Sequence, residues 1–176
     1  HDVGRAGELL ESATAKAQEA VQDVRRLVHG LRPPALDDLG LAGALRAMES
    51  SAGDGGIRIA VTCRGSVGDL PAAVEVAAFR IAQEALTNTV RHSGATSAAV
   101  SLDVADSVVV SVVDDGHGIP AGRIAGVGMA SMRERAAELG GSLEVEPVLP
   151  QGTRVTATIP LAVSRPVLPV PREVAR

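Results

Sequence analysis

Apolar residues recur along the chain at two different periods, which predict its helices and strands. Positions three and four apart share one face of a helix, so apolar residues at these spacings predict helices at 8–31, 70–92 and 129–139. Short β-branched runs predict strands at 57–64, 97–104, 107–113, 142–146 and 154–159. A turn and a short helix are expected over 36–48, and a loop over 50–56. This order predicts an α+β two-layer sandwich with helices gathered on one face of a sheet.

The two ends of the chain differ from this central pattern. The helix at 8–31 ends before Pro33-Pro34, because proline cannot continue a helix. The apolar stripe of this helix could pack either on the surface of its own domain or against other helices in a dimerisation bundle. Residues 162–176 carry prolines with little periodicity, which predicts a flexible tail.

Composition narrows the classes of protein. The 176 residues are 45% hydrophobic with one Phe and no Trp or Tyr, so the core must consist of Val, Leu, Ile and Ala. A net charge of −4 and a pI near 5.6 argue against a general nucleic-acid binder, which needs a basic face. The single cysteine, Cys63, excludes an internal disulfide and is expected as a partly buried strand residue. We find neither a membrane-spanning run nor a signal-peptide pattern. A cytoplasmic location is expected, with any membrane anchor of the intact protein upstream of residue 1.

Polar residues and glycines cluster in the middle of the chain. Glu84, Asn88 and His92 are four residues apart and therefore share one helix face. The run Asp114–Gly118 follows a strand, where a carboxylate can accept a hydrogen bond from an exocyclic amine. Gly126 and its neighbours open a helix, whose free N–H groups favour phosphate. An asparagine oxygen suits Mg²⁺, which usually shares its ligands with nucleotide phosphates.

These segments resemble a known family. Glu84–His92, Asp114–Gly118, Gly126–Arg135 and Gly152-Thr153 resemble, in order and spacing, the N, G1 and G2 boxes of the histidine-kinase ATP-binding domain. Gyrase B, Hsp90 and MutL share that fold. Upstream, Val24–Leu45 resembles the second helix and connector of the NarL-partner sensor kinases, the subgroup that includes DesK.

The resemblance implies a fold and a division into domains. The fold would be the Bergerat, or GHKL, ATP-binding sandwich, with a mixed and mostly antiparallel sheet. Residues 1–34 would be part of a helical dimerisation hairpin, 35–161 the ATP-binding catalytic domain, and 162–176 the tail.

The resemblance also implies ATP and Mg²⁺ as cofactors and assigns roles to residues. Asn88 would be the Mg²⁺ ligand, Glu84 would act as base on the attacking histidine or orient the metal, and Asp114 would bind the adenine amino group. Further nucleotide contacts would come from Arg91 and His92 at the phosphates, Gly116 and Gly118 beside the base and ribose, Gly126, Gly128 and Met129 around the phosphates, and Thr153 over the base. His92 equally fits a histidine stabilised by the helix C-terminus. The default expectation for Asp115 and His117 is an exposed turn.

The implied activity is that of a sensor histidine kinase, a homodimer when intact. It would pass the ATP γ-phosphoryl group to a histidine and then to a response regulator of LuxR/NarL type. The subgroup carries the acceptor on the first hairpin helix, but His1 lies too close to Leu31-Arg32-Pro33 for that helix, a turn and most of the second helix to fit between them. His29 lacks the acidic residue that follows the acceptor. We therefore expect no acceptor in this chain and no autophosphorylation in isolation. The alternatives are a serine kinase of the anti-sigma-factor type with the same fold, and a nucleotide-gated dimerisation module without catalysis.

Overall fold

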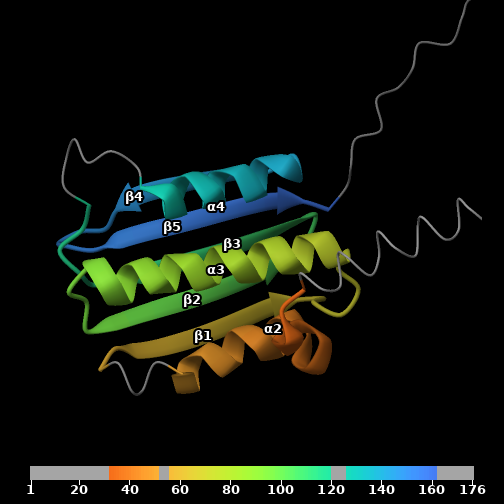
Figure 1. Cartoon of the computed structure of the whole chain (residues 1–176), viewed down its shortest axis with the longest axis horizontal. Helices are drawn as coiled ribbons and strands as arrows, with labels where there is room; N and C mark the ends of the chain where they lie inside the picture. Colours follow the sequence, from red (N-terminus) through yellow and green to blue (C-terminus); the bar gives the residue numbers. More distant parts are fainter. Residues whose placement is uncertain (1–31, 52–55, 120–125, 162–176) are drawn as a thin grey trace, which may run out of the picture.

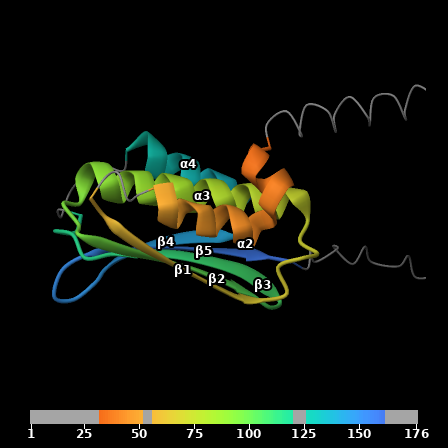
Figure 2. The same cartoon turned by 90° about the horizontal axis from the view of Figure 1, so that it is seen from below.

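A mixed five-stranded sheet with the strand order β1-β2-β3-β5-β4 forms one layer of the protein. The structure, a computed structural model, describes residues 32–51, 56–119 and 126–161. The strands are β1 (Arg58–Gly65), β2 (Ser97–Val104), β3 (Ser107–Asp114), β4 (Ser142–Pro147) and β5 (Thr153–Pro160). The helices are α2 (Pro34–Ser51), α3 (Ala72–His92) and α4 (Val127–Glu138). The three helices lie side by side on one face of the sheet (Figures 1 and 2), which confirms the predicted α+β sandwich.

The strand pairing follows from the connections between strands. β1 and β2 are parallel, because α3 returns the chain across the sheet between them. β2 and β3 form the antiparallel hairpin predicted from the short Ala105-Asp106 turn, and β5 pairs antiparallel with both β3 and β4. This order brings the ends of β3 and β5 together, with Asp114 directly opposite Thr153.

The core lies between the helices and the sheet. Its largest fully buried side chains are Leu36, Leu41, Leu45, Ile81, Leu102, Met132, Ile159, Val100, Val108 and Val110. Alternate residues of β3 are buried, as expected for a strand with one face on the core. On the other face, Ser111 Oγ and Thr156 Oγ1 lie 3.1 Å apart across neighbouring strands. Cys63 is half-buried on β1, as expected, and burial raises the pKa of its thiol.

The short helix predicted after the prolines is α2, and it is longer than expected. Gly40 interrupts it with φ 63° and ψ 177°, so that a helical turn precedes the kink and the helix proper follows it. Leu36, Leu41 and Leu45 from both pieces reach the core. The helix runs to Ser51, where the sequence predicted a loop from residue 50.

An ion pair joins the start of the described chain to α3. Arg32 Nη2 lies 2.6 Å from Glu75 Oε2, and both side chains are largely buried, at 14% and 12% exposed. Asp37 Oδ1 lies 2.8 Å from Arg32 Nε, an ion pair without hydrogen-bond alignment. The predicted helix at 8–31 and the tail at 162–176 lie outside the described residues. None of the described helices has the length and apolarity needed to cross a bilayer.

Candidate functional site

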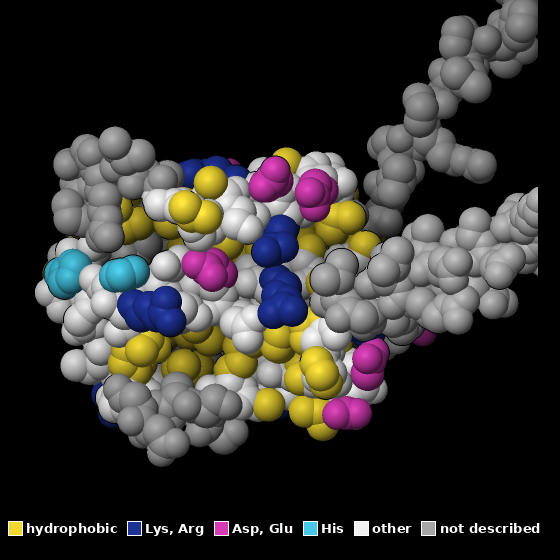
Figure 3. Space-filling view, in the orientation of Figure 1, with side chains coloured by type: hydrophobic (Ala, Val, Ile, Leu, Met, Phe, Trp, Pro, Cys, Tyr) yellow, Lys and Arg dark blue, Asp and Glu magenta, His cyan; other side chains and the backbone are white. Residues whose placement is uncertain are grey.

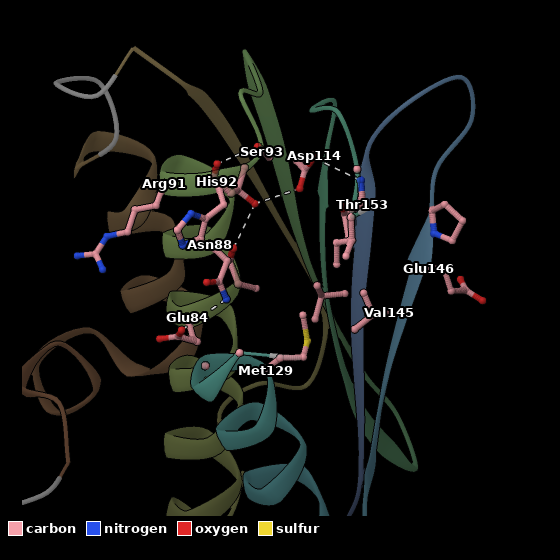
Figure 4. Close-up of a pocket in the computed structure, with 18 of the residues that line it drawn as sticks. Glu84, Asn88, Arg91, His92, Ser93, Asp114, Met129, Val145, Glu146 and Thr153 are labelled. Carbon is pink, nitrogen blue, oxygen red and sulfur yellow. Dashed lines mark hydrogen bonds between the residues drawn. The ribbon is translucent and has the colours of Figure 1, made fainter. Parts of the chain in front are cut away.

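A cavity of about 610 Å³ opens between the C-terminal half of α3, the start of α4 and the ends of β3, β4 and β5. Figure 4 shows Glu84 and Asn88 on the α3 side and Asp114 and Thr153 across from them. The cavity is lined by predicted site residues Glu84, Asn88, Arg91, His92, Asp114, Gly118, Gly126, Gly128, Met129 and Thr153. The fold thus brings together segments that are far apart in the sequence. Gly116, the remaining predicted residue, is buried and is not among the lining residues.

Asp114 is the buried carboxylate of the cavity, with 7% of its surface exposed. Its Oδ1 accepts hydrogen bonds from the Gly116 N–H at 2.9 Å and the Thr153 N–H at 3.3 Å. Its Oδ2 lies 3.2 Å from the Thr89 hydroxyl, whose one proton is shared between Asp114 and Ala85 O at 3.1 Å. These contacts hold the carboxylate on the helix-facing side of β3. Oδ1 is saturated by its two backbone donors, whereas Oδ2 keeps a lone pair for a further donor. A buried and oriented carboxylate of this kind can select a ligand that carries an amino group.

Gly116 allows the strand end to pass close to the end of α3. A Cβ atom at this position would lie 2.5 Å from both Cβ and O of Ser93, closer than real side chains pack. The His117 N–H donates to the same Ser93 carbonyl at 2.9 Å. A side chain at residue 116 would therefore separate the two segments that flank Asp114.

Glu84 and Asn88 form the opposite wall. Asn88 Nδ2 donates to Glu84 Oε1 at 3.4 Å, which leaves the amide oxygen as the atom that could ligate a cation. Gly128 comes so close to Glu84 that a Cβ there would overlap Glu84 Oε1. Among the described residues, no three His, Cys, Asp or Glu side chains gather as a metal cage. The donor set fits Mg²⁺ only where a bound phosphate and water complete the coordination.

The start of α4 faces the same space. Gly126 is its N-cap residue, and the first intrahelical bond, from Ala130 N–H to Gly126 O, is 3.1 Å long. The N–H groups of Val127, Gly128 and Met129 precede that bond, so they have no partner within the helix and can bind an anion. This wall is therefore suited to phosphate.

Arg91 and His92 end α3 at the rim of the cavity. Both are exposed, and Figure 4 shows the Arg91 side chain extending away from Asp114 and Thr153. Figure 3 shows histidine and arginine side chains gathered at this end of the molecule. The structure thus places Arg91 and His92 beside the cavity, and their predicted phosphate contacts stay predictions.

Sequence reasoning missed several residues of the site. Thr89 binds Asp114, Ser93 packs on Gly116, and Val145 and Val155 add apolar surface from β4 and β5. Thr89 lies on the same buried face of α3 as Ala78, Ala82 and Ala85. A hydroxyl among these small apolar residues is the signal that could have identified Thr89 as a site residue. Asp115 follows the end of β3, as expected, but it is half-buried rather than exposed. Its carboxylate accepts hydrogen bonds from Thr96 and Ser97, which the sequence did not predict.

One cavity is lined by a buried carboxylate, by an amide and carboxylate pair, and by a helix that begins with glycine. These features are those of a nucleotide-binding α+β sandwich. Residues 73–163 match the family described as Histidine kinase-, DNA gyrase B-, and HSP90-like ATPase. The chain belongs to this family. Membership implies that the chain uses ATP.

Curated relatives agree with this assignment. The chain is 38% identical over 156 residues to the sensor histidine kinase MctS of Rhizobium johnstonii, covering 84% of this chain and 33% of that protein. It is 36% identical over 162 residues to the signal transduction histidine-protein kinase/phosphatase UhpB of Salmonella typhimurium, covering 90% and 31%. With the sensor histidine kinase NarS of Mycobacterium tuberculosis it shares 34% over 164 residues, covering 88% and 37%. The chain thus spans about a third of the length of these relatives.

A solved structure supports the fold. The chain matches the histidine kinase domain of a blue-light activated histidine kinase from Erythrobacter litoralis with a TM-score of 0.59 and 25% identity. The match covers 78% of this chain and 73% of that one.

Proposed function

We propose that the chain is the ATP-binding catalytic domain of a two-component sensor histidine kinase. The intact protein would be a homodimer that transfers the γ-phosphoryl group to a histidine, which we predict to lie outside residues 1–176, and then to a response regulator of LuxR/NarL type. The observation that carries the proposal is the buried Asp114 carboxylate, held by three donors across the cavity from Glu84 and Asn88. The sensor histidine kinases among the relatives favour this activity over a serine kinase of the same fold.

In this proposal the cavity has a base side and a phosphate side. Asp114 accepts the adenine amino group, Gly118 leaves room for base and ribose, and Thr153 covers the base. Gly116 acts from outside the cavity lining, by letting the end of β3 pass close to Ser93. On the phosphate side the helix start at Gly126, Gly128 and Met129 binds the phosphates, with Arg91 and His92 at the rim. Asn88 would hold Mg²⁺, whose charge, when the ion is bound, neutralises that of the phosphates. Glu84 lies next to Asn88, where it can orient the metal or accept a proton from the attacking histidine.

The base side is tested by titrating Mg-ATP into the Asp114→Asn variant by calorimetry. A hydrogen bond to a charged group contributes about 1.5–3 kcal/mol, so ATP affinity should fall about 10- to 150-fold. Asp106→Asn, at the exposed turn between β2 and β3, is the matched control and should bind like wild type. Equal affinity of the Asp114→Asn variant and wild type would show that the site is wrong.

The metal side is tested by titrating ATP with Mg²⁺ and again with EDTA. Loss of the amide oxygen in Asn88→Ala should remove most of the affinity that Mg²⁺ adds, and leave metal-free binding close to wild type. Gln83→Ala removes an amide from the same helix outside the cavity and should keep the full effect of Mg²⁺. A wild-type response of Asn88→Ala to Mg²⁺ would contradict the assignment of Asn88.

Phosphoryl transfer itself needs an acceptor. The chain should be mixed with a separate acceptor hairpin and γ-labelled ATP, and acid-labile phosphohistidine should appear on the hairpin. Acid-stable phosphoserine would instead indicate the serine-kinase alternative. ATP binding without any transfer would favour the dimerisation module.

A further inference from the structure

Asp115 follows the adenine-site carboxylate but faces a different partner. Its Oδ1 accepts hydrogen bonds from the backbone N–H groups of Thr96 at 2.8 Å and Ser97 at 2.9 Å. Its Oδ2 accepts from the hydroxyls of the same residues, at 2.8 Å and 2.9 Å. One carboxylate is therefore saturated by the segment that joins α3 to β2.

The backbone of Asp115 adds two further connections. Its N–H donates to Ser97 O at 3.2 Å, and Gln151 Nε2, from the turn between β4 and β5, donates to Asp115 O at 3.0 Å. Asp115 thus joins three segments that meet at the base side of the cavity. The hydrogen bonds from Ser97 and Thr96 hold the pKa of the Asp115 carboxyl well below its usual range, so the clamp is charged at neutral pH.

The segment held by Asp115 also touches the surroundings of Asp114. Ser93, just upstream, packs on Gly116 and accepts the His117 N–H at 2.9 Å. The Gly116 N–H in turn donates to Asp114 Oδ1. If the clamp opened, the strand end would lose its hold on this segment, and the donors that orient Asp114 would shift with it.

We propose that Asp115 is a positioning residue of the nucleotide site, whose carboxylate clamps residues 93–97 to the end of β3 and thereby fixes the Asp114 carboxylate toward the adenine amino group. This inference rests on the proposed function, in which Asp114 binds adenine. It predicts that Asp115 governs recognition of the amino group without touching the nucleotide.

The test compares ATP with purine riboside triphosphate, which lacks the amino group, in Mg²⁺ titrations of the full chain. Wild type should bind ATP more tightly than the analogue, and Asp115→Ala should lose most of this preference. The ratio of the two affinities falls about tenfold for each 1.4 kcal/mol lost from the hydrogen bond between Asp114 and the amino group. Asp115→Asn should restore it to within about threefold, because its amide oxygen still accepts both backbone N–H groups and the two hydroxyls can turn to accept from its nitrogen. Asp106→Ala, at the exposed turn between β2 and β3, is the control and should keep the preference.

A gentler variant covers the case in which Asp115→Ala does not fold. Thr96→Val with Ser97→Ala removes only the hydroxyl half of the clamp and should lower the preference by a smaller factor. A wild-type preference in this double variant, or in folded Asp115→Ala, overturns the role of Asp115. If wild type itself binds neither nucleotide, or Asp114→Asn leaves the preference unchanged, the proposed function fails instead.

Discussion

Replacing Glu75 with glutamine should destabilise the fold markedly, although residue 75 lies outside the cavity. Glu75 sits in the first turn of α3 and accepts Arg32 Nη2 at 2.6 Å. Glutamine keeps the shape of the side chain and removes its charge. The Arg32 guanidinium would then stay in a site where only 14% of the side chain is exposed, with half-exposed Asp37 as its remaining counter-ion.

The expected loss follows from this geometry. Removing one partner of a fully buried ion pair costs about 3–5 kcal/mol, because the other charge is left uncompensated. The loss should be smaller here, because the ion pair is partly exposed and Asp37 remains as a counter-ion. We therefore expect Glu75→Gln to lower the free energy of unfolding by about 2–3 kcal/mol. For a chain of this size that is a fall in Tm of roughly 5–10 °C.

Urea unfolding followed by far-UV circular dichroism measures the effect, since the chain has no Trp or Tyr for fluorescence. Glu138→Gln, at an exposed position on α4, is the matched control and should stay within about 0.5 kcal/mol of wild type. The double variant Arg32→Met with Glu75→Met removes both charges and should recover much of the loss. A Glu75→Gln variant as stable as wild type, or a double variant as unstable as the sum of its single changes, would refute this reasoning.

Two further predictions concern the end of β3. Gly116→Ala should lower stability by about 1–3 kcal/mol and weaken ATP binding, because the new Cβ would meet Ser93. Gly68→Ala has open space around its Cβ and should change neither property. Thermal melts measure stability and calorimetry measures ATP binding, and unchanged binding by Gly116→Ala would contradict the close approach. The depressed pKa of Asp115 contributes stability that is complete above the unfolded value near 3.9 and is lost as pH falls through the folded pKa. The Tm of wild type should therefore fall more steeply than that of Asp115→Asn between about pH 5 and pH 2, and a constant Tm difference would count against this.

The elements of the fold could be predicted because their signals are local. The apolar stripe of α3 and the alternation of β3 each lie within one segment, and the turn between β2 and β3 is two residues long. The parallel pairing of β1 with β2, and the position of β5 between β3 and β4, depend on contacts between distant segments. Periodicity carries no information on such contacts, so the resemblance to the family, and not the pattern, supplied the expectation of a mixed sheet.

The candidate site shows the same limit at the level of single residues. Asp114 and Asn88 could be singled out because strand ends and helix faces have sequence signatures. The partners of Asp115 lie 18 and 19 residues upstream, across a strand pair, and nothing in the residue itself distinguishes this clamp from an exposed turn. The buried pair of Arg32 and Glu75 is hidden for the same reason, since its members are 43 residues apart.

The two sides of the cavity differ in how far folding alone has prepared them. Thr89, Gly116 and Thr153 hold Asp114 with hydrogen bonds of 2.9–3.3 Å, so the base side is oriented before any ligand arrives. On the phosphate side, Asn88 and Glu84 meet at 3.4 Å, and the Arg91 side chain extends away from the base side. Ordering such side chains on binding costs free energy, which the phosphate and metal contacts must offset. Changes on the base side should therefore weaken ATP and ADP alike, whereas changes on the phosphate side should alter the difference between them.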